Sequence, residues 1–326
     1  MKLLKMLTQA ASPSGNEEVI REVIKNEVLC LANDIKVDAL GNLICHIEGT
    51  GPRLLIDAHM DEIGIIVTYI EENGFLRFSN LGGVVLNAAH SQRVRFLNGT
   101  TGIVYREQNK NQKDIKLSEL FIDIGAKSRE EAESKIKVGD VAVFVGAFEE
   151  TDTKIISKAL DDRSGCYVLI ETMKRIKAHK NDLYFVFSVS EELGLRGAKA
   201  VSYTVKPDFA IAVDVTRTGD LPDETKMSVK LGGGAAIKVK DNSVLCHPII
   251  KNALEETAKE NGILYQFEVL ENGGTNTGAI HVSNGGVPSG CISIPTRYIH
   301  TPAEMIDKND LENVIKLLTK VIERGF

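Results

Sequence analysis

Apolar residues recur along this chain at two different intervals, one typical of helices and one typical of buried strands. Intervals of three and four residues predict amphipathic helices near both ends of the chain. The residues that carry these intervals are Ile20, Val23, Ile24 and Val28 near the start, and Leu311, Val314, Ile315, Leu318 and Ile322 near the end. We expect Ser14 to cap the first of these helices, with Glu17 three residues later completing a capping box.

Short runs of consecutive apolar residues that end in polar residues predict buried strands. Four runs have this form, at residues 53–61, 183–190, 208–213 and 289–295. Helical patterns at 164–176 and 248–260 lie between them. Because strands that alternate with helices form a largely parallel sheet covered on both faces, the sequence predicts an α/β fold.

The segment from residue 67 to residue 155 has a different pattern. Short β-type segments follow one another closely there, at 74–80, 92–99, 101–106, 120–125 and 141–146, and only 128–136 looks helical. We therefore expect a small β-rich domain at 67–155, inserted between two parts of an α/β domain at 1–66 and 156–326. The polar stretch 107–114 is expected to be a mobile loop.

The composition argues against proteins that bind nucleic acid, span a membrane or depend on disulfides. With 39 basic and 45 acidic residues among 326, the formal net charge is -6, so the chain lacks the basic excess that binds nucleic acid or anionic membranes. No run approaches the roughly 20 apolar residues that span a bilayer, and residues 1–12 predict an amphipathic helix rather than a signal peptide. Five scattered cysteines without C-x-x-C spacing predict neither disulfides nor a zinc knuckle. We expect a cytoplasmic protein with a small neutral or cationic substrate.

Acidic and imidazole side chains follow each of the predicted buried strands. They are His59 and Asp61, then Glu191 and Glu192, then Asp214, and finally His300 a few residues after the last strand. The carboxyl ends of strands in an open α/β sheet form the ligand crevice, so we expect these groups to converge. Imidazole and carboxylate ligands without thiolate suit Zn²⁺ or Co²⁺, and Mn²⁺ is also compatible.

Two acidic pairs strengthen the prediction of a metal centre. Glu191-Glu192 would repel nearby carboxylates unless cations offset the charge, and Asp161-Asp162 opens a helix where one carboxylate could bridge two ions. Each pair also has a simpler interpretation, as a solvated helix start or an N-cap pair. Neither interpretation explains why such groups recur at strand ends. Packing or surface roles are expected for the remaining histidines, which lack carboxylate partners: His46, His90, His179, His247 and His281.

Six segments, ordered along almost the whole chain, resemble the M42 metallo-aminopeptidases. They are DAHMDEIG (57–64), LFIDIGAKSREEA (120–132), KALDDRSG (158–165), SVSEELGLRGA (188–198), AVDVT (212–216) and IPTRYIHTPAE (294–304). The resemblance implies a phosphorylase/hydrolase-like α/β domain, with a mixed sheet flanked by helices and an inserted small β-barrel that is PDZ-like. It also implies a homo-oligomer assembled through this insertion, commonly a dodecamer built from dimers.

The resemblance further implies roles for individual residues. One of two divalent metal ions would be held by His59, Asp161 and Asp214, and the other by Asp161, Glu192 and His300. Glu191 would be the general base for a metal-bridging water, and Asp61 would orient His59. The peptide bond between Asp161 and Asp162 is expected to be cis.

The sequence departs from the family's pattern at two places. Residues 275–277, Thr-Asn-Thr, stand where many relatives have an Asp in a G-T-D-A segment, which removes a possible negative charge near the site. The insertion also lacks the Pro-His pair that many relatives carry after the strand matching 101–106. Assembly contacts or a loop near the site are therefore expected to differ from those of such relatives.

The function favoured by the residues and the resemblance together is a dinuclear-metal aminopeptidase that acts on short peptides with a free N-terminus. A glycoside hydrolase would need a carboxylate pair and aromatic platforms, whereas this chain has no Trp and 6% aromatic residues. A metal-dependent N-acyl amino acid deacylase would use the same metal pair on a blocked amide. A non-enzymatic binding protein would tolerate replacement of the site residues.

Overall fold

The computed structural model describes residues 1–107, 115–222 and 226–326, so the predicted mobile loop at 107–114 lies outside the described residues except for Glu107. The described residues form a large mixed sheet and a separate barrel. The sheet order is β1 (Asp34–Val37), β2 (Leu43–Ile47), β12 (Asp182–Ser188), β3 (Arg53–His59), β13 (Phe209–Thr216), β16 (Ser289–Arg297), β17 (Glu304–Asp307), β11 (Lys154–Ser157) and β10 (Glu149–Glu150). Two further strands join beside β16, namely β14 (Ala235–Lys240) and β15 (Tyr265–Val269).

The four predicted buried strands form the centre of this sheet. β12, β3, β13 and β16 lie side by side and run parallel. β2 pairs antiparallel with β12, and both β14 and β17 pair antiparallel with β16. Alternate residues of β3 enter different cores: Leu54 and Ile56 pack on one face, and Leu55 packs on the other. Burial on both faces explains why these strands read as nearly continuous apolar runs.

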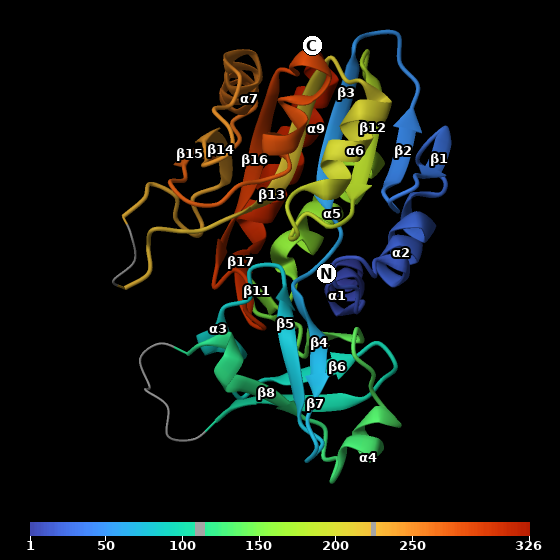
Figure 1. Cartoon of the computed structure of the whole chain (residues 1–326). Helices are drawn as coiled ribbons and strands as arrows, with labels where there is room; N and C mark the ends of the chain where they lie inside the picture. The colour runs from blue at the N-terminus through green and yellow to red at the C-terminus, as the bar shows by residue number, and fades with distance from the viewer. Residues whose placement is uncertain (108–114, 223–225) are drawn as a thin grey trace.

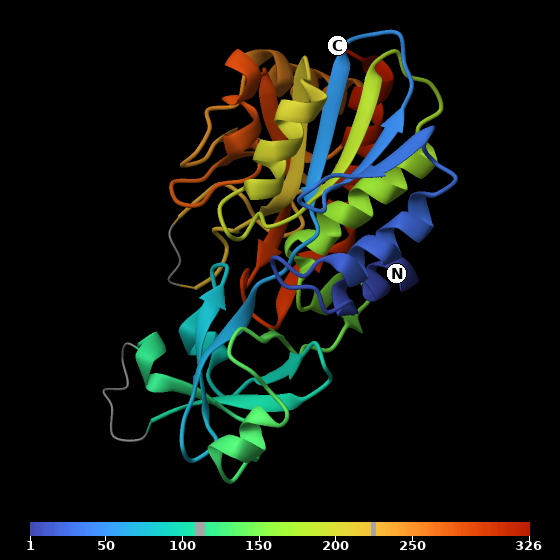
Figure 2. The same ribbon diagram turned by 45° about the vertical axis from the view of Figure 1, so that its right-hand side comes forward.

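Helices cover both faces of the sheet (Figures 1 and 2). One face carries α1 (Lys2–Gln9), α2 (Glu18–Val28), α5 (Leu160–Arg175), α7 (Pro248–Glu260) and α9 (Lys308–Arg324). The other carries α6 (Arg196–Val205) and α8 (Thr277–Ile280), with the 3₁₀ turn η2 (Ser283–Gly285) close by. No helix in the described ranges is long and apolar enough to cross a membrane.

The predicted cap of the second helix is wrong. α2 begins at Glu18, and Ser14 does not cap it. The Ser14 hydroxyl instead donates to the buried Asp61 carboxylate at 2.7 Å. Ser12, two residues earlier, accepts the Ile20 N–H at 3.1 Å. The capping-box pattern is present, but a tertiary partner takes the hydroxyl that the pattern assigned to the helix.

The β-rich segment forms a closed six-stranded barrel with its own apolar core. Its strands, in order around the barrel, are β4 (Gly64–Ile70), β5 (Leu76–Leu81), β8 (Leu120–Asp123), β7 (Thr101–Arg106), β6 (Arg93–Phe96) and β9 (Val141–Phe144). Three short helical pieces accompany it: α3 (Leu86–Ala89), η1 (Leu117–Glu119) and α4 (Arg129–Glu133). The barrel lies beyond the end of the large sheet at which β3 passes into β4 (Figure 1).

Candidate metal centre

The seven predicted site residues meet at the carboxyl ends of the central strands. They are His59 at the end of β3, Asp61 just after it, Asp161 at the start of α5, Glu191 and Glu192 between β12 and α6, Asp214 in β13, and His300 between β16 and β17. All of these residues except Asp61 line one cavity of about 460 Å³. The convergence expected from strand-end placement is therefore present in the fold, while the roles of the residues stay predictions.

The side chains form two groups that share Asp161. His59 Nε2 lies 3.0 Å from Asp161 Oδ1 and 3.9 Å from Asp214 Oδ1. His300 Nε2 lies 3.3 Å from Asp161 Oδ2 and 3.2 Å from Glu192 Oε1. Within each group, the atoms that could ligate a metal lie within 4.8 Å of one another. The two oxygens of Asp161 thus face different groups, as its predicted role of bridging ligand requires.

The start of α5 sets the position of Asp161. Asp161 and Asp162 have non-helical backbone angles although they lie within α5, and the peptide bond between them is cis, as the resemblance implies. Asp162 belongs to neither group. Its carboxylate accepts the backbone N–H of Gly165 at 3.0 Å and that of His59 at 3.3 Å. Asp162 therefore ties the start of α5 to the end of β3.

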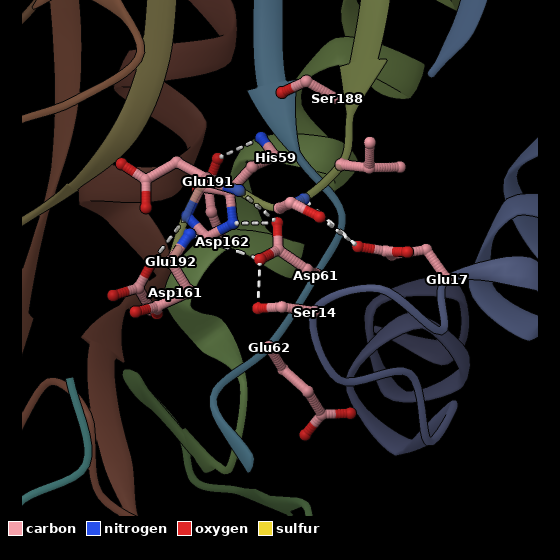
Figure 3. Close-up of polar contacts among 12 residues, drawn as sticks. Ser14, Glu17, His59, Asp61, Glu62, Asp161, Asp162, Ser188, Glu191 and Glu192 are labelled. Atoms are coloured by element: carbon pink, nitrogen blue, oxygen red, sulfur yellow. Dashed lines mark hydrogen bonds and ion pairs between the residues drawn. The ribbon is translucent and has the colours of Figure 1, made fainter. Parts of the chain in front are cut away.

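Asp61 is fully buried beside His59 (Figure 3). Its Oδ1 lies 3.3 Å from His59 Nδ1, the ring nitrogen opposite the one that faces Asp161. The same carboxylate accepts the backbone N–H groups of Glu191 at 3.0 Å and Glu192 at 3.3 Å. This geometry suits a partner that orients His59, and it also links Asp61 to the turn that carries both glutamates.

Burial opposes negative charge in this cavity. It raises the pKa of Asp214 to about 8 and the pKa of Glu191 well above its usual range. The pKa of Asp162 is also well above its usual range, because of burial and then the charge of Asp214. Burial alone would lower the pKa of His300, but hydrogen bonds with two carboxylates outweigh it and raise the pKa to about 11. Without cations, Asp214 would therefore be largely protonated at neutral pH.

The residues fit divalent cations on the chemistry of their donor atoms. Each group offers one imidazole nitrogen and two carboxylates, and neither includes a thiolate. This donor set suits Zn²⁺, Co²⁺ or Mn²⁺. Two cations would also offset the burial and mutual repulsion that raise the carboxylate pKa values. The site is therefore a candidate dinuclear metal centre.

The raised pKa of Asp214 predicts how the metal-free protein responds to pH. Its pKa of about 8 in the folded chain exceeds the value near 4 of an unfolded chain. Its contribution to stability is therefore complete below about pH 4 and is lost as the pH rises through about 8. Asp214→Asn removes the charge but keeps the Oδ1 that accepts the Val215 N–H. We expect the chelated variant to melt several degrees above the chelated wild type at pH 9, with the difference narrowing toward pH 5.

The same pair of proteins provides a control with metal. Added Zn²⁺ should reverse the order of the two melting temperatures, because Asp214→Asn lacks one of the proposed ligands. Both proteins are scanned by calorimetry at the same protein concentration, with and without chelator. Equal melting temperatures of the chelated proteins from pH 5 to pH 9 would contradict the assigned burial of charge at Asp214.

Glu304, the first residue of β17, is a member of this site that the strand-end pattern did not identify. Its buried carboxylate accepts the backbone N–H of Asp161 at 3.0 Å and that of His300 at 2.9 Å. His300 has a φ of 65°, in the left-handed region that residues other than glycine rarely adopt. Glu304 therefore holds the backbone of two proposed ligands. Its carboxylate binds main-chain atoms, which no side-chain motif reveals.

Glu304→Gln should weaken metal binding. Gln offers one carbonyl oxygen and one NH₂, so it can accept only one of the two backbone N–H groups. Losing a partner that orients metal ligands typically costs about 10–100-fold in metal affinity, and we expect about tenfold for Zn²⁺ in competition with a chromophoric chelator. Glu323→Gln is the matched control, because Glu323 accepts the Lys177 N–H at 3.2 Å and does not line the cavity. Equal Zn²⁺ affinity of the two variants would rule out this role for Glu304.

The barrel also reaches the site, which the sequence patterns did not predict. Gly83 follows β5, lines the cavity, and donates its N–H to Glu192 Oε2 at 3.3 Å. A Cβ at Gly83 would lie 2.5 Å from His300 Nδ1, so the close approach requires glycine. The inserted segment therefore forms part of the wall of the cavity.

Asn276 is the residue that was expected to remove a negative charge near the site. Its neutral amide donates to Asp57 Oδ1 at 2.5 Å and to Ser188 Oγ at 2.9 Å. Burial raises the pKa of Asp57 to about 7, and the amide of Asn276 opposes this rise.

The expectation that His46 lacks a carboxylate partner is wrong: its Nε2 lies 2.6 Å from Asp182 Oδ1. β2 and β12 are sheet neighbours far apart in sequence, so spacing could not reveal this pair.

Comparison with known proteins agrees with this geometry. A family profile described as M42 glutamyl aminopeptidase matches residues 41–317. A protein of Acetivibrio thermocellus that is named as an aminopeptidase is 54% identical over 322 residues, which cover 98% of this chain and 97% of that protein. The solved structure of aminopeptidase APDkam598 from the archaeon Desulfurococcus kamchatkensis has a TM-score of 0.95 at 38% identity, over 99% of this chain and 94% of that one.

A second solved structure extends the comparison to an assembly. The TET1 peptidase of Pyrococcus horikoshii, described as able to assemble into a tetrahedron or a large octahedral shell, has a TM-score of 0.88 at 35% identity, over 98% of each chain. The profile and the matched chains cover the large sheet, the barrel and all the segments that supply the two groups of side chains. From the sheet, the barrel and these matches together, the chain belongs to the M42 glutamyl aminopeptidase family.

Proposed function

We propose that this chain removes the N-terminal residue from short peptides that have a free α-amino group, with two divalent cations bound in the cavity. The observation that carries the proposal is the pair of ligand groups that share Asp161, with Glu191 lining the same cavity. Membership of the M42 family makes the chain a hydrolase that acts on peptide bonds. The proposed ligands are His59, Asp161 and Asp214 for one cation, and Asp161, Glu192 and His300 for the other.

The side chains of the cavity divide the chemistry. Zn²⁺ or Co²⁺ bound there would act as a Lewis acid toward the scissile carbonyl and lower the pKa of water. Glu191 belongs to neither ligand group, so its carboxylate is available to accept a proton from the attacking water and pass it to the leaving amine. Asp61 keeps the imidazole of His59 turned so that Nε2 faces Asp161.

The lining of the cavity argues against one of the two other hydrolases. Its lining within the described part of the chain contains no Phe, Tyr or Trp, so it lacks the platforms on which sugar rings stack. The absence of aromatic side chains from this described lining argues against a glycoside hydrolase. An N-acyl amino acid deacylase would use the same proposed metal pair, so only the choice between blocked and unblocked amides separates it from an aminopeptidase.

The proposed function is tested with a panel of aminoacyl-anilides that have a free N-terminus, their N-acetylated twins, and carboxymethylcellulose. We expect cleavage of the unblocked anilides alone. Preference for the acetylated twins would establish a deacylase, and release of sugar from the cellulose would establish a glycoside hydrolase. Either result would overturn the proposal.

Arg217 is expected to disfavour basic N-terminal residues in the substrate. Apart from the six proposed metal-centre and base residues, it is the single ionisable side chain among the described residues that line the cavity. A second positive charge within several Å costs roughly 1–4 kcal/mol at the dielectric of a protein surface. Arg217→Met should therefore raise kcat/KM for lysyl-anilide relative to leucyl-anilide by about tenfold, or about 1.4 kcal/mol.

Arg297→Met is the matched control for that measurement. Arg297 lines a second cavity together with Arg217, but its guanidinium is paired with Asp220 at 2.7 Å and it does not line the cavity of the metal centre. The ratio of the two kcat/KM values should stay at the wild-type level in Arg297→Met. An unchanged ratio in Arg217→Met as well would show that Arg217 does not sense the substrate side chain.

We further propose that the chain forms a homo-oligomer through the inserted segment 67–155, with a dodecamer as the expected size. The Pyrococcus horikoshii TET1 peptidase, similar over 98% of its chain, can assemble into a tetrahedron or a large octahedral shell. The barrel exposes large apolar side chains that suit an interface, namely Tyr69, Leu97, Ile103, Tyr105 and Val138.

We also propose a cytoplasmic location. All five cysteines are free, as is usual for proteins of a reducing compartment.

A further inference from the structure

A short turn between α1 and α2 lies against the part of the chain that carries Glu191 and Glu192. We call residues 13–17 the N-terminal turn. Pro13 and Glu62 form an isolated parallel bridge, in which the Ser14 N–H donates to the Glu62 carbonyl at 3.3 Å. This pairing fixes the N-terminal turn beside the residue that follows Asp61. None of its side chains lines the cavity.

Ser14 reaches the base through Asp61 (Figure 3). Its hydroxyl donates to Asp61 Oδ2 at 2.7 Å, and both side chains are almost completely buried. Asp61 in turn accepts the backbone N–H groups of Glu191 and Glu192. A carboxylate can rotate about its terminal bond, and a third donor at a fixed position restricts that rotation. Ser14 therefore helps to fix the carboxylate that holds the backbone on both sides of the base.

Glu17 reaches the base from its other side, through Ser190. Its Oε1 accepts the Ser190 N–H at 3.1 Å, the Ser190 hydroxyl at 3.3 Å and the Gly15 N–H at 2.7 Å. Ser190 precedes Glu191 and has a φ of 53°, in the left-handed region. Residues other than glycine keep such a conformation only when their surroundings enforce it. Glu17, which is 4% exposed, supplies that enforcement.

We propose that Ser14 and Glu17 are positioning residues for Glu191, the first acting through Asp61 and the second through Ser190. The inference rests on the proposed function, in which Glu191 is the base. Neither Ser14 nor Glu17 belongs to a ligand group or lines the cavity, so at saturating Zn²⁺ their replacement should change the placement of a carboxylate and leave the metal content at the wild-type value. A small misplacement of a catalytic group can cost up to about 100-fold in rate.

The first test is kinetic. At saturating Zn²⁺, Ser14→Ala and Glu17→Ala should each lower kcat about tenfold, with KM for leucyl-anilide and bound metal per chain unchanged. Glu17→Gln keeps an Oε1 acceptor and should restore most of the lost rate. Ser12→Ala is the matched control. Ser12 is the buried residue immediately before the turn, and its hydroxyl accepts the Ile20 N–H. It should lower the melting temperature and leave kcat at the wild-type level.

A double-mutant cycle separates positioning from general structural damage. When Glu191→Gln is combined with Ser14→Ala or Glu17→Ala, no further loss of rate is expected, because both residues act through the carboxylate that is already gone. Losses that multiply in the combined variants would overturn the inference. If Glu17→Ala fails to fold, Ser14→Ala carries the test, since it removes a single oxygen.

Amide hydrogen exchange tests the inference without any hydrolysis. Ser14→Ala should speed exchange at the N–H groups of Glu191 and Glu192 about tenfold, and Glu17→Ala should do so at Ser190. Ser12→Ala should leave all three at the wild-type rate. If the wild type cleaves no peptide but the variants show this exchange pattern, the proposed function is contradicted. The inference that the N-terminal turn positions the backbone at residues 190–192 is then still supported. Exchange in Ser14→Ala and Glu17→Ala equal to that in Ser12→Ala would overturn the inference itself.

Discussion

Glu191→Gln lowers kcat for an unblocked anilide by about 10³-fold and leaves bound metal unchanged, if the roles proposed here are correct. Removing a general base typically costs about 10²–10⁴-fold. Gln has nearly the same shape as Glu but cannot accept the proton of water at neutral pH. Because Glu191 belongs to neither ligand group, the metal content should not change. The rate is measured with leucyl-anilide and the metal by elemental analysis of the dialysed protein.

Glu192→Gln is the matched control for that variant. Glu192 is the next residue in the same turn, and its Oε1 lies 3.2 Å from His300 Nε2 in the second ligand group. It should lose metal as well as rate, and excess Zn²⁺ should restore part of the rate. Excess Zn²⁺ should restore nothing in Glu191→Gln. Substantial activity in Glu191→Gln, or loss of metal from that variant, would contradict the assignment of Glu191 as the general base.

Asp161→Asn should reduce bound metal from about two ions per chain to nearly none. The two oxygens of Asp161 face His59 at 3.0 Å and His300 at 3.3 Å, so a single substitution weakens both groups. Asn offers one neutral oxygen, which ligates divalent cations more weakly than a carboxylate. Because the metal is lost, kcat should fall by at least as large a factor as in Glu191→Gln. The bound metal is measured by elemental analysis and Zn²⁺ titration.

Asp214→Asn is the comparison that separates a bridging ligand from an ordinary one. Asp214 belongs to one group alone, so this variant should retain about one ion per chain. If Asp161→Asn and Asp214→Asn retained equal amounts of metal, Asp161 would not bridge two sites. The stability of each chelated variant should be measured alongside, because removal of a buried charge also changes the melting temperature.

The centre of the fold could be predicted because its strands are buried on both faces. The apolar runs at 53–61 and 289–295 correspond to β3 and β16, which lie within the parallel core of the sheet. The flanking strands could not be predicted in the same way. β1 and β10 are short and partly or fully exposed, so their residues carry no apolar run. Their place in the sheet depends on pairing with residues distant in sequence.

The candidate site could be predicted as far as its residues follow strand ends or match family segments. Glu304 lies in the family segment 294–304, but its role and that of Gly83 were missed because they depend on main-chain contacts and close approach rather than on side-chain type. The capping-box prediction for Ser14 failed for a related reason. A hydroxyl that could cap a helix binds a buried carboxylate 47 residues away in sequence, and local patterns contain no information about such partners.

The measurement that tests the central claim most directly is a titration of the chelated protein with Zn²⁺ or Co²⁺. Bound metal per chain is followed together with cleavage of leucyl-anilide and of its N-acetylated twin. We predict no cleavage by the chelated protein, recovery that is complete at about two ions per chain, and cleavage of the unblocked anilide alone. Cleavage that survives chelation, or recovery that favours the acetylated twin, would contradict a metal-dependent aminopeptidase.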